Sequence, residues 1–73
     1  MTVTEAQIYK LLSDPTPRQF SQLGFSLLVT RMKGLYKSDP TPTTLTKCTD
    51  EINAFLKKFG AIMHADISIL SKL

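Results

Sequence analysis

Apolar residues recur at helical spacing in three stretches of this chain, and polar segments with prolines separate the stretches. In residues 43–72 they follow one another at intervals of three and four, which places them on one face of an α-helix. Residues 17–36 have the same period but are apolar over most of the helix circumference. No stretch shows the period of two that is typical of a strand. The pattern predicts an all-α fold of three antiparallel helices: a short one at 5–12, a central one at 17–36 and a long one at 43–72.

The connectors at 13–16 and 37–42 contain one pentapeptide, "SDPTP", which occurs at residues 13–17 and again at 38–42. The residue before a proline is pushed out of the helical conformation, so each Asp-Pro is expected to end a helix. Thr-Pro is typical of a helix start, with Thr as N-cap and Pro at the first helical position. In the second copy, Thr43 and Thr44 are alternative caps. The residues after the two copies do not match. We therefore interpret the repeat as a stop and a start used twice, rather than as an internal duplication.

Two capping boxes support these helix starts. In a capping box the side chains of the N-cap and of the third helical residue each bind the other's backbone N–H. Thr4 and Gln7 have this spacing before the first helix, and Thr16 and Gln19 have it before the second. Within the third helix, Gly60 is less favourable than Ala by about 1 kcal/mol, so a bend is feasible there.

Length and composition indicate one globular helical domain, residues 1–73. The chain is 42% apolar and 21% charged, with a net charge of +3, and its single cysteine cannot form an internal disulfide. The Cys, His and carboxylate spacing predicts no metal site, and we expect no cofactor. We find neither a signal peptide nor an apolar run of ~18 residues, so we expect a cytoplasmic protein. A single core in a chain this short rarely supplies more than about 3–5 kcal/mol, which favours completion of the helical bundle by a partner or a dimer.

Candidate catalytic residues do not assemble on the predicted helices. His64 and Ser68 share a face at i, i+4, but Asp66 points away from them, so no local catalytic triad forms. Cys48 lies in the apolar stripe, where a cysteine acts as a small hydrophobe. We therefore expect no enzyme activity.

Asp66 is the exceptional residue, because it lies inside the apolar stripe of the third helix between Met63 and Leu70. A buried carboxylate needs partners. Three interpretations remain open: Asp66 caps a separate short helix after a break following His64, it binds a cation or a helix N-terminus elsewhere in the fold, or it is exposed to water.

The second connector also predicts a register. If the second and third helices form an antiparallel hairpin about residue 40, Arg31 lies level with Asp50 and Glu51 and pairs with one of them. By the same count Asp66 lies beyond the start of the second helix, near Arg18 and the positive helix end.

That register leaves residues 65–73 beyond the end of the second helix. We predict that this overhang and a spare face of the second helix form a homodimer or partner interface. The alternative is a break at Asp66, after which the tail folds back over its own core. The predicted interface residues are Phe25, Val29, Met32, Ile67, Ile69, Leu70 and Leu73.

The sequence thus favours a small non-enzymatic protein–protein interaction module, such as an adaptor, chaperone-like subunit or regulator. The alternative is a DNA-binding transcriptional regulator that uses Arg18, Gln19 and Gln22 at the start of the second helix, whose side chains suit base edges. The chain ends Ser71-Lys72-Leu73, which is a peroxisomal signal if the protein is eukaryotic and these residues are free.

Overall fold

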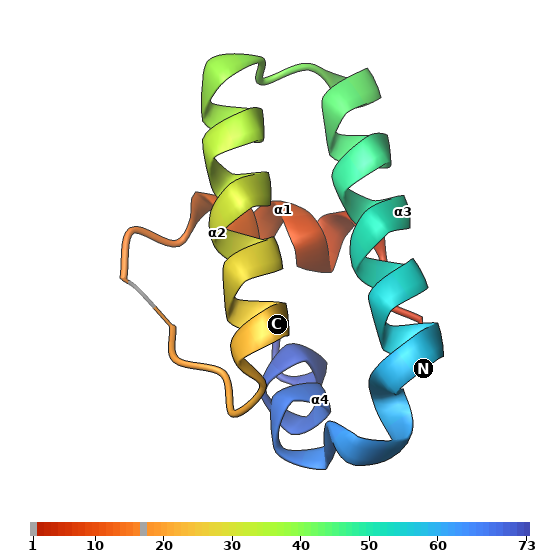
Figure 1. The fold of residues 1–73 in the computed structure, drawn as a ribbon. Helices are drawn as coiled ribbons and strands as arrows, with labels where there is room; N and C mark the ends of the chain where they lie inside the picture. The colour runs from red at the N-terminus through yellow and green to blue at the C-terminus, as the bar shows by residue number, and fades with distance from the viewer. Residues whose placement is uncertain (1, 17) are drawn as a thin grey trace.

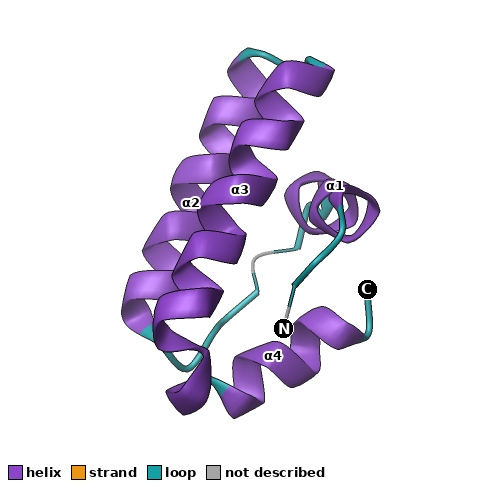
Figure 2. Cartoon of the chain, turned by 90° about the vertical axis from the view of Figure 1, so that its right-hand side faces the viewer, coloured by secondary structure: helices purple, strands orange, loops and turns teal. Residues whose placement is uncertain are grey.

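The structure, a computed structural model, describes residues 2–16 and 18–73 and is all-helical over that range. Its elements are α1 (Glu5–Ser13), α2 (Leu23–Ser38), α3 (Pro42–Phe59), a short 3₁₀ turn η1 (Gly60–Ile62) and α4 (His64–Ser71). Helices α2 and α3 form an antiparallel hairpin (Figure 1). Figure 2 shows α1 and α4 on one side of this hairpin, which leaves its other side uncovered. The all-α prediction is confirmed, but the described residues form four α-helices instead of three.

Helix α1 forms where the sequence predicts it. Thr4 caps it, since the Thr4 hydroxyl oxygen accepts the Gln7 N–H at 3.1 Å. The Gln7 side chain completes the capping box by accepting the Thr4 N–H at 2.9 Å. The helix buries Ile8, Leu11 and Leu12, and its C-cap is Asp14. The first pentapeptide therefore ends a helix, as expected.

The first pentapeptide does not begin a helix, so the predicted start of the second helix at residue 17 is wrong. Helix α2 begins at Leu23, and residues 18–22 are non-helical. Pro17 lies outside the described residues. The Asp14 carboxylate accepts the Thr16 N–H at 2.9 Å, which holds the chain in a turn after α1. The proposed capping box of Thr16 and Gln19 consequently has no helix to cap.

The second pentapeptide both ends and starts a helix, as predicted. Helix α2 ends at Ser38. The Thr41 hydroxyl oxygen accepts the Thr44 N–H at 3.2 Å, with Pro42 at the first helical position of α3. Thr44 in turn donates its hydroxyl to the Asp39 carboxylate at 2.7 Å. Thr16 therefore lies in a loop, whereas its counterpart Thr41 is an N-cap.

The predicted long helix at 43–72 is wrong as one element, because it divides at η1. Helix α3 ends at Phe59, Gly60 begins the 3₁₀ turn, and α4 starts at His64 after a non-helical Met63. The break turns α4 back beneath the hairpin (Figure 1), where Met63 and Leu70 are fully buried. Burying these side chains within the chain favours two helices over a single straight one.

Helices α1, α2, α3 and α4 and the non-helical residues Val3, Phe20 and Met63 contribute to one apolar core. An edge-to-face pair, Phe20 on Phe25 with centroids 4.8 Å apart, fills the end near α4. The core residues, all at most 8% exposed, are Val3, Ile8, Leu11, Leu12, Phe20, Phe25, Val29, Met32, Cys48, Ile52, Leu56, Met63 and Leu70.

Candidate interaction surface

The face of α2 that we predicted to be spare is instead the buried one. Phe25, Val29 and Met32 are only 0%, 5% and 2% exposed, so they cannot form a partner interface. They belong to the core that α1 and α4 cover. A helix with apolar residues around most of its circumference has two possible core faces, and the docking of α1 selects this one.

The predicted C-terminal overhang is also wrong, and the fold-back alternative is the arrangement found. Leu70 is fully buried, while Ile67, Ile69 and Leu73 are partly buried against the core. Lys10 on α1 donates to the Leu73 carbonyl at 3.4 Å, so the last residues pack on the chain itself.

Asp66 fastens this folded-back segment to α2. Its carboxylate is fully buried and accepts the Ser21 N–H at 2.7 Å, the Ser21 hydroxyl at 3.0 Å and the Gln22 N–H at 3.2 Å. Gln22 is the N-cap position of α2, and its own side chain makes no capping bond. Asp66 therefore caps α2 from another helix, where the helix dipole favours a negative charge. The interpretation that Asp66 binds a helix N-terminus is confirmed.

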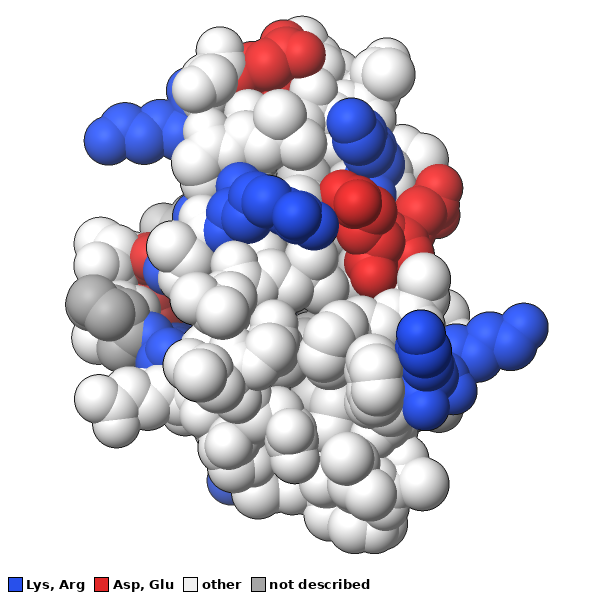
Figure 3. Space-filling model, in the orientation of Figure 1, with Lys and Arg blue, Asp and Glu red and all other residues white. Residues whose placement is uncertain are grey.

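The hairpin and the η1 turn after it expose a group of large apolar side chains, Leu23, Leu27, Phe59 and Ile62, which we call the outer apolar face. Leu23 is 72% exposed and Leu27 62%, one turn apart on α2. Ile62 is 64% exposed, and Phe59, one 3₁₀ turn before it, is 36% exposed. Figure 3 shows a broad surface without charged side chains over the lower part of the hairpin. Tyr9, also exposed, lies on α1 and packs edge-on against Tyr36.

A shallow hollow of about 290 Å³ lies within the outer apolar face. It is lined by Gly24, Leu27, Leu28, Arg31 and Phe55. Gly24 leaves its floor open, because a Cβ at this position would lie 3.5 Å from the Phe55 ring. The hollow adjoins Phe59 through the partly buried Phe55, since the two ring centroids are 4.6 Å apart.

Two cations stand beside the outer apolar face. Arg31 lines the hollow, and its Nη2 lies 3.9 Å from the Glu51 Oε1. The predicted hairpin register is therefore confirmed. The Arg31 side chain is nevertheless 69% exposed, so this contact contributes little to stability. The Lys58 Nζ lies 5.4 Å from the Phe59 ring centroid, within cation–π range.

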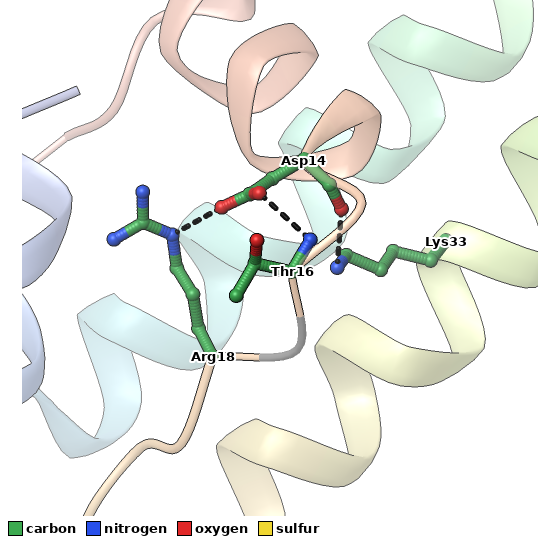
Figure 4. Close-up of polar contacts among 4 residues, drawn as sticks. All are labelled: Asp14, Thr16, Arg18 and Lys33. Carbon is green, nitrogen blue, oxygen red and sulfur yellow. Dashed lines mark hydrogen bonds and ion pairs between the residues drawn. The ribbon is translucent and has the colours of Figure 1, made fainter.

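The residues of the DNA-binding alternative do not share a helix. Arg18 and Gln19 lie in the loop before α2, and Gln22 is half-buried at the N-cap position. The Arg18 Nε donates to the Asp14 carboxylate at 2.8 Å (Figure 4), so the guanidinium is partly engaged within the loop. A recognition helix formed by these residues is contradicted, because residues 18–22 are non-helical and α2 begins only at Leu23.

Asp14 organises this loop. The Thr16 N–H holds the pKa of the Asp14 carboxyl below its ordinary value, and Arg18 contributes to the same effect. The Asp14 carbonyl also accepts from the Lys33 Nζ at 3.0 Å, which ties the loop to α2 (Figure 4). The cations around Asp14 therefore have structural partners.

Side chains that could act in catalysis or bind a metal either have structural roles or lie apart from one another. Asp66 of α4 is buried against the start of α2, whereas His64 and Ser68 are exposed, so the three side chains form no triad. Cys48 is fully buried, and burial raises the pKa of its thiol. Among the described residues no group of His, Cys, Asp and Glu could hold a metal ion. A further hollow, of about 620 Å³, is lined in part by Asn53, whose amide binds the Val3 backbone.

Comparison with protein-family models, curated proteins and solved structures finds no match to this chain. Over the described residues, no helix combines the length and the apolar character that crossing a membrane requires. Function is therefore inferred from the geometry of the chain itself, in which the outer apolar face is the strongest candidate site.

The sequence contained part of the signal for this site. The apolar circumference of α2 indicates that more than one side of the helix meets other elements. Leu23 and Leu27 follow the i, i+4 rule as clearly as Phe25 and Val29 do. Periodicity identifies both faces, but it does not say which one the rest of the chain covers.

Proposed function

We propose that this chain is a small non-enzymatic protein–protein interaction module that binds a partner through the outer apolar face. The observation that carries the proposal is the exposure of Leu23 and Leu27, each above 60% and one turn apart on α2, together with the exposure of Ile62 in η1, also above 60%. Clustered exposed apolar side chains are typical of interaction sites, whereas single ones are ordinary.

Burying the outer apolar face against a partner would contribute a substantial favourable free energy. Fully burying one Leu or Ile side chain contributes about 1.5–3 kcal/mol. Phe59, with Phe55 beside it, adds aromatic area, and aromatic residues are enriched in interface centres. Part of this gain is offset by the loss of translational and side-chain freedom on association.

The absence of an enzymatic role belongs to the same proposal. Its support is that the buried polar chemistry is committed to the fold: the Asp66 oxygens accept three hydrogen bonds, and the Cys48 thiol faces the Met32 carbonyl at 3.9 Å. An adaptor or regulator acting in the cytoplasm fits such a chain. A homodimer is one form of the proposal, now through the outer apolar face instead of the C-terminal segment.

Site-specific photocrosslinking tests the proposal. A photoreactive amino acid replaces Leu27 in one protein and Ala6 in another, since Ala6 is exposed on α1 on the covered side of the hairpin. In an extract of the source cells, position 27 is expected to form discrete protein adducts that Leu23→Asp abolishes. Equal adducts from positions 27 and 6 would contradict a specific site. Sedimentation equilibrium of the purified chain shows whether a second copy is the partner.

A further inference from the structure

We infer that the partner of the outer apolar face is an acidic amphipathic helix, which lies along α2 with an apolar side chain in the hollow beside Gly24. This inference rests on the proposed function and adds the chemistry of the partner. The observations are the shape of the hollow, the spacing of the exposed residues and the sign of the charges beside them.

The shape fits a helix. Leu23, Leu27 and Arg31 repeat every four residues, so they form one row along the exposed side of α2. Between this row and Phe55 of α3, the missing side chain of Gly24 leaves the hollow of about 290 Å³. A groove between two packed helices accepts the ridge of a third, and an apolar helix in a groove is a common mode of recognition. The partner is therefore expected to carry apolar residues at i, i+3 or i+4, and i+7.

The charges select an acidic helix. Arg31 lines the hollow, with its side chain 69% exposed and a single 3.9 Å contact to Glu51. Its guanidinium still has donors for a carboxylate, and such pairs are directional and charge-assisted. Lys58 stands at the Phe59 end of the same face. Among the described residues that line the hollow there is no acidic side chain.

The same charges disfavour a second copy as the occupant. A two-fold interface places the same patch of both subunits in contact, so the cations of one copy approach those of the other. Each chain also carries a net charge of +3, which opposes association. An acidic helix removes both repulsions. Anionic lipid would also match the charges, but the hollow is concave and sized for a side chain rather than for a flat surface.

A pair of designed peptides tests this inference. Both are 16-residue helices with the same apolar stripe; one has glutamates beside the stripe and the other has lysines. Binding is measured by fluorescence anisotropy at low salt, where charge selectivity is greatest. The glutamate peptide is expected to bind at least tenfold more tightly than the lysine peptide. Arg31→Gln is expected to reduce this preference at least threefold, whereas Lys10→Gln, on α1, leaves it unchanged.

Variants of the apolar row locate the binding. Leu27→Asp is expected to weaken binding of the glutamate peptide at least tenfold. Ala6→Asp adds the same charge on the covered side and is expected to leave the affinity unchanged. Circular dichroism verifies each fold, and Leu23→Asp replaces Leu27→Asp if the latter does not fold. Equal binding of both peptides overturns the acidic partner but leaves the proposed function intact, as does a concentration-dependent dimer without peptide binding. Binding of anionic phospholipid vesicles with no binding of either peptide overturns both.

Discussion

The carboxylate of Asp66 on α4 accepts two hydrogen bonds from Ser21, at 2.7 Å from the N–H and 3.0 Å from the hydroxyl, across 45 residues of sequence. A third bond, from the Gln22 N–H, places this acid at the start of α2. One side chain therefore fixes where α2 begins and where α4 docks. It connects the two segments whose positions differ most from the sequence-based expectation.

Replacing Asp66 by Ala is expected to destabilise the protein. It removes the acceptor of two part-buried backbone N–H groups, and since leaving a fully buried donor without a partner costs about 1–3 kcal/mol, we expect a loss at the lower end of this range. Asp66→Asn keeps one carbonyl acceptor and should lose less. Urea unfolding measures the free energy, with Asp50→Ala, at an exposed acid of α3, as the control. Equal stability of the Asp66→Ala and Asp50→Ala proteins would contradict the capping role.

The two pentapeptides offer a matched pair of substitutions. Thr41→Ala removes the N-cap of α3 and is expected to cost about 1 kcal/mol. Thr16→Ala removes an exposed side chain of a residue whose backbone N–H binds Asp14, so its effect should stay within about 0.5 kcal/mol. Chemical unfolding of both variants measures the two losses of stability. A larger loss from Thr16→Ala than from Thr41→Ala would show that the first copy also caps a helix in solution.

Gly34→Ala is expected to stabilise the protein by about 0.5–1 kcal/mol. Gly34 lies inside α2, and a Cβ there would meet nothing within 4 Å. Alanine lowers the entropy of the unfolded chain and has the higher helix propensity. Thermal unfolding should show a higher midpoint for the variant. A lower midpoint would mean that residue 34 is not in an open helical position.

The buried thiol of Cys48 is expected to make the stability of the protein depend on pH. Burial raises the pKa of its thiol above the ordinary 9.0, so the folded state favours the neutral form. Its contribution to stability is present below the unfolded pKa and is lost as pH rises through the higher folded value. We expect the free energy of unfolding to fall between pH 8 and 10, and to fall less in Cys48→Ala. Urea titrations at these pH values measure both slopes, and parallel slopes would rule out the thiol as the cause.

The sequence by itself determined the helical class, the cap of α1, the cap of α3 and the register of the hairpin. These features depend on local chemistry or on one short connector. Thr4 and Gln7 close a capping box across three residues, and Thr41 with Pro42 starts α3 in the same local way. Arg31 meets Glu51 because the turn between α2 and α3 is short and fixes the pairing.

The tertiary structure decided the start of α2, the break before α4 and the face that remains exposed. The pentapeptide at residues 13–17 is locally identical to the one at 38–42, yet the N–H groups ahead of α2 are satisfied by Asp66 from the far end of the chain. Phe25 and Leu27 are both apolar, but only Phe25 is covered when α1 and α4 dock. The apolar period indicates which faces of a helix can be buried. Which face is buried depends on contacts between distant segments, and these follow from the free energy of the whole packed core.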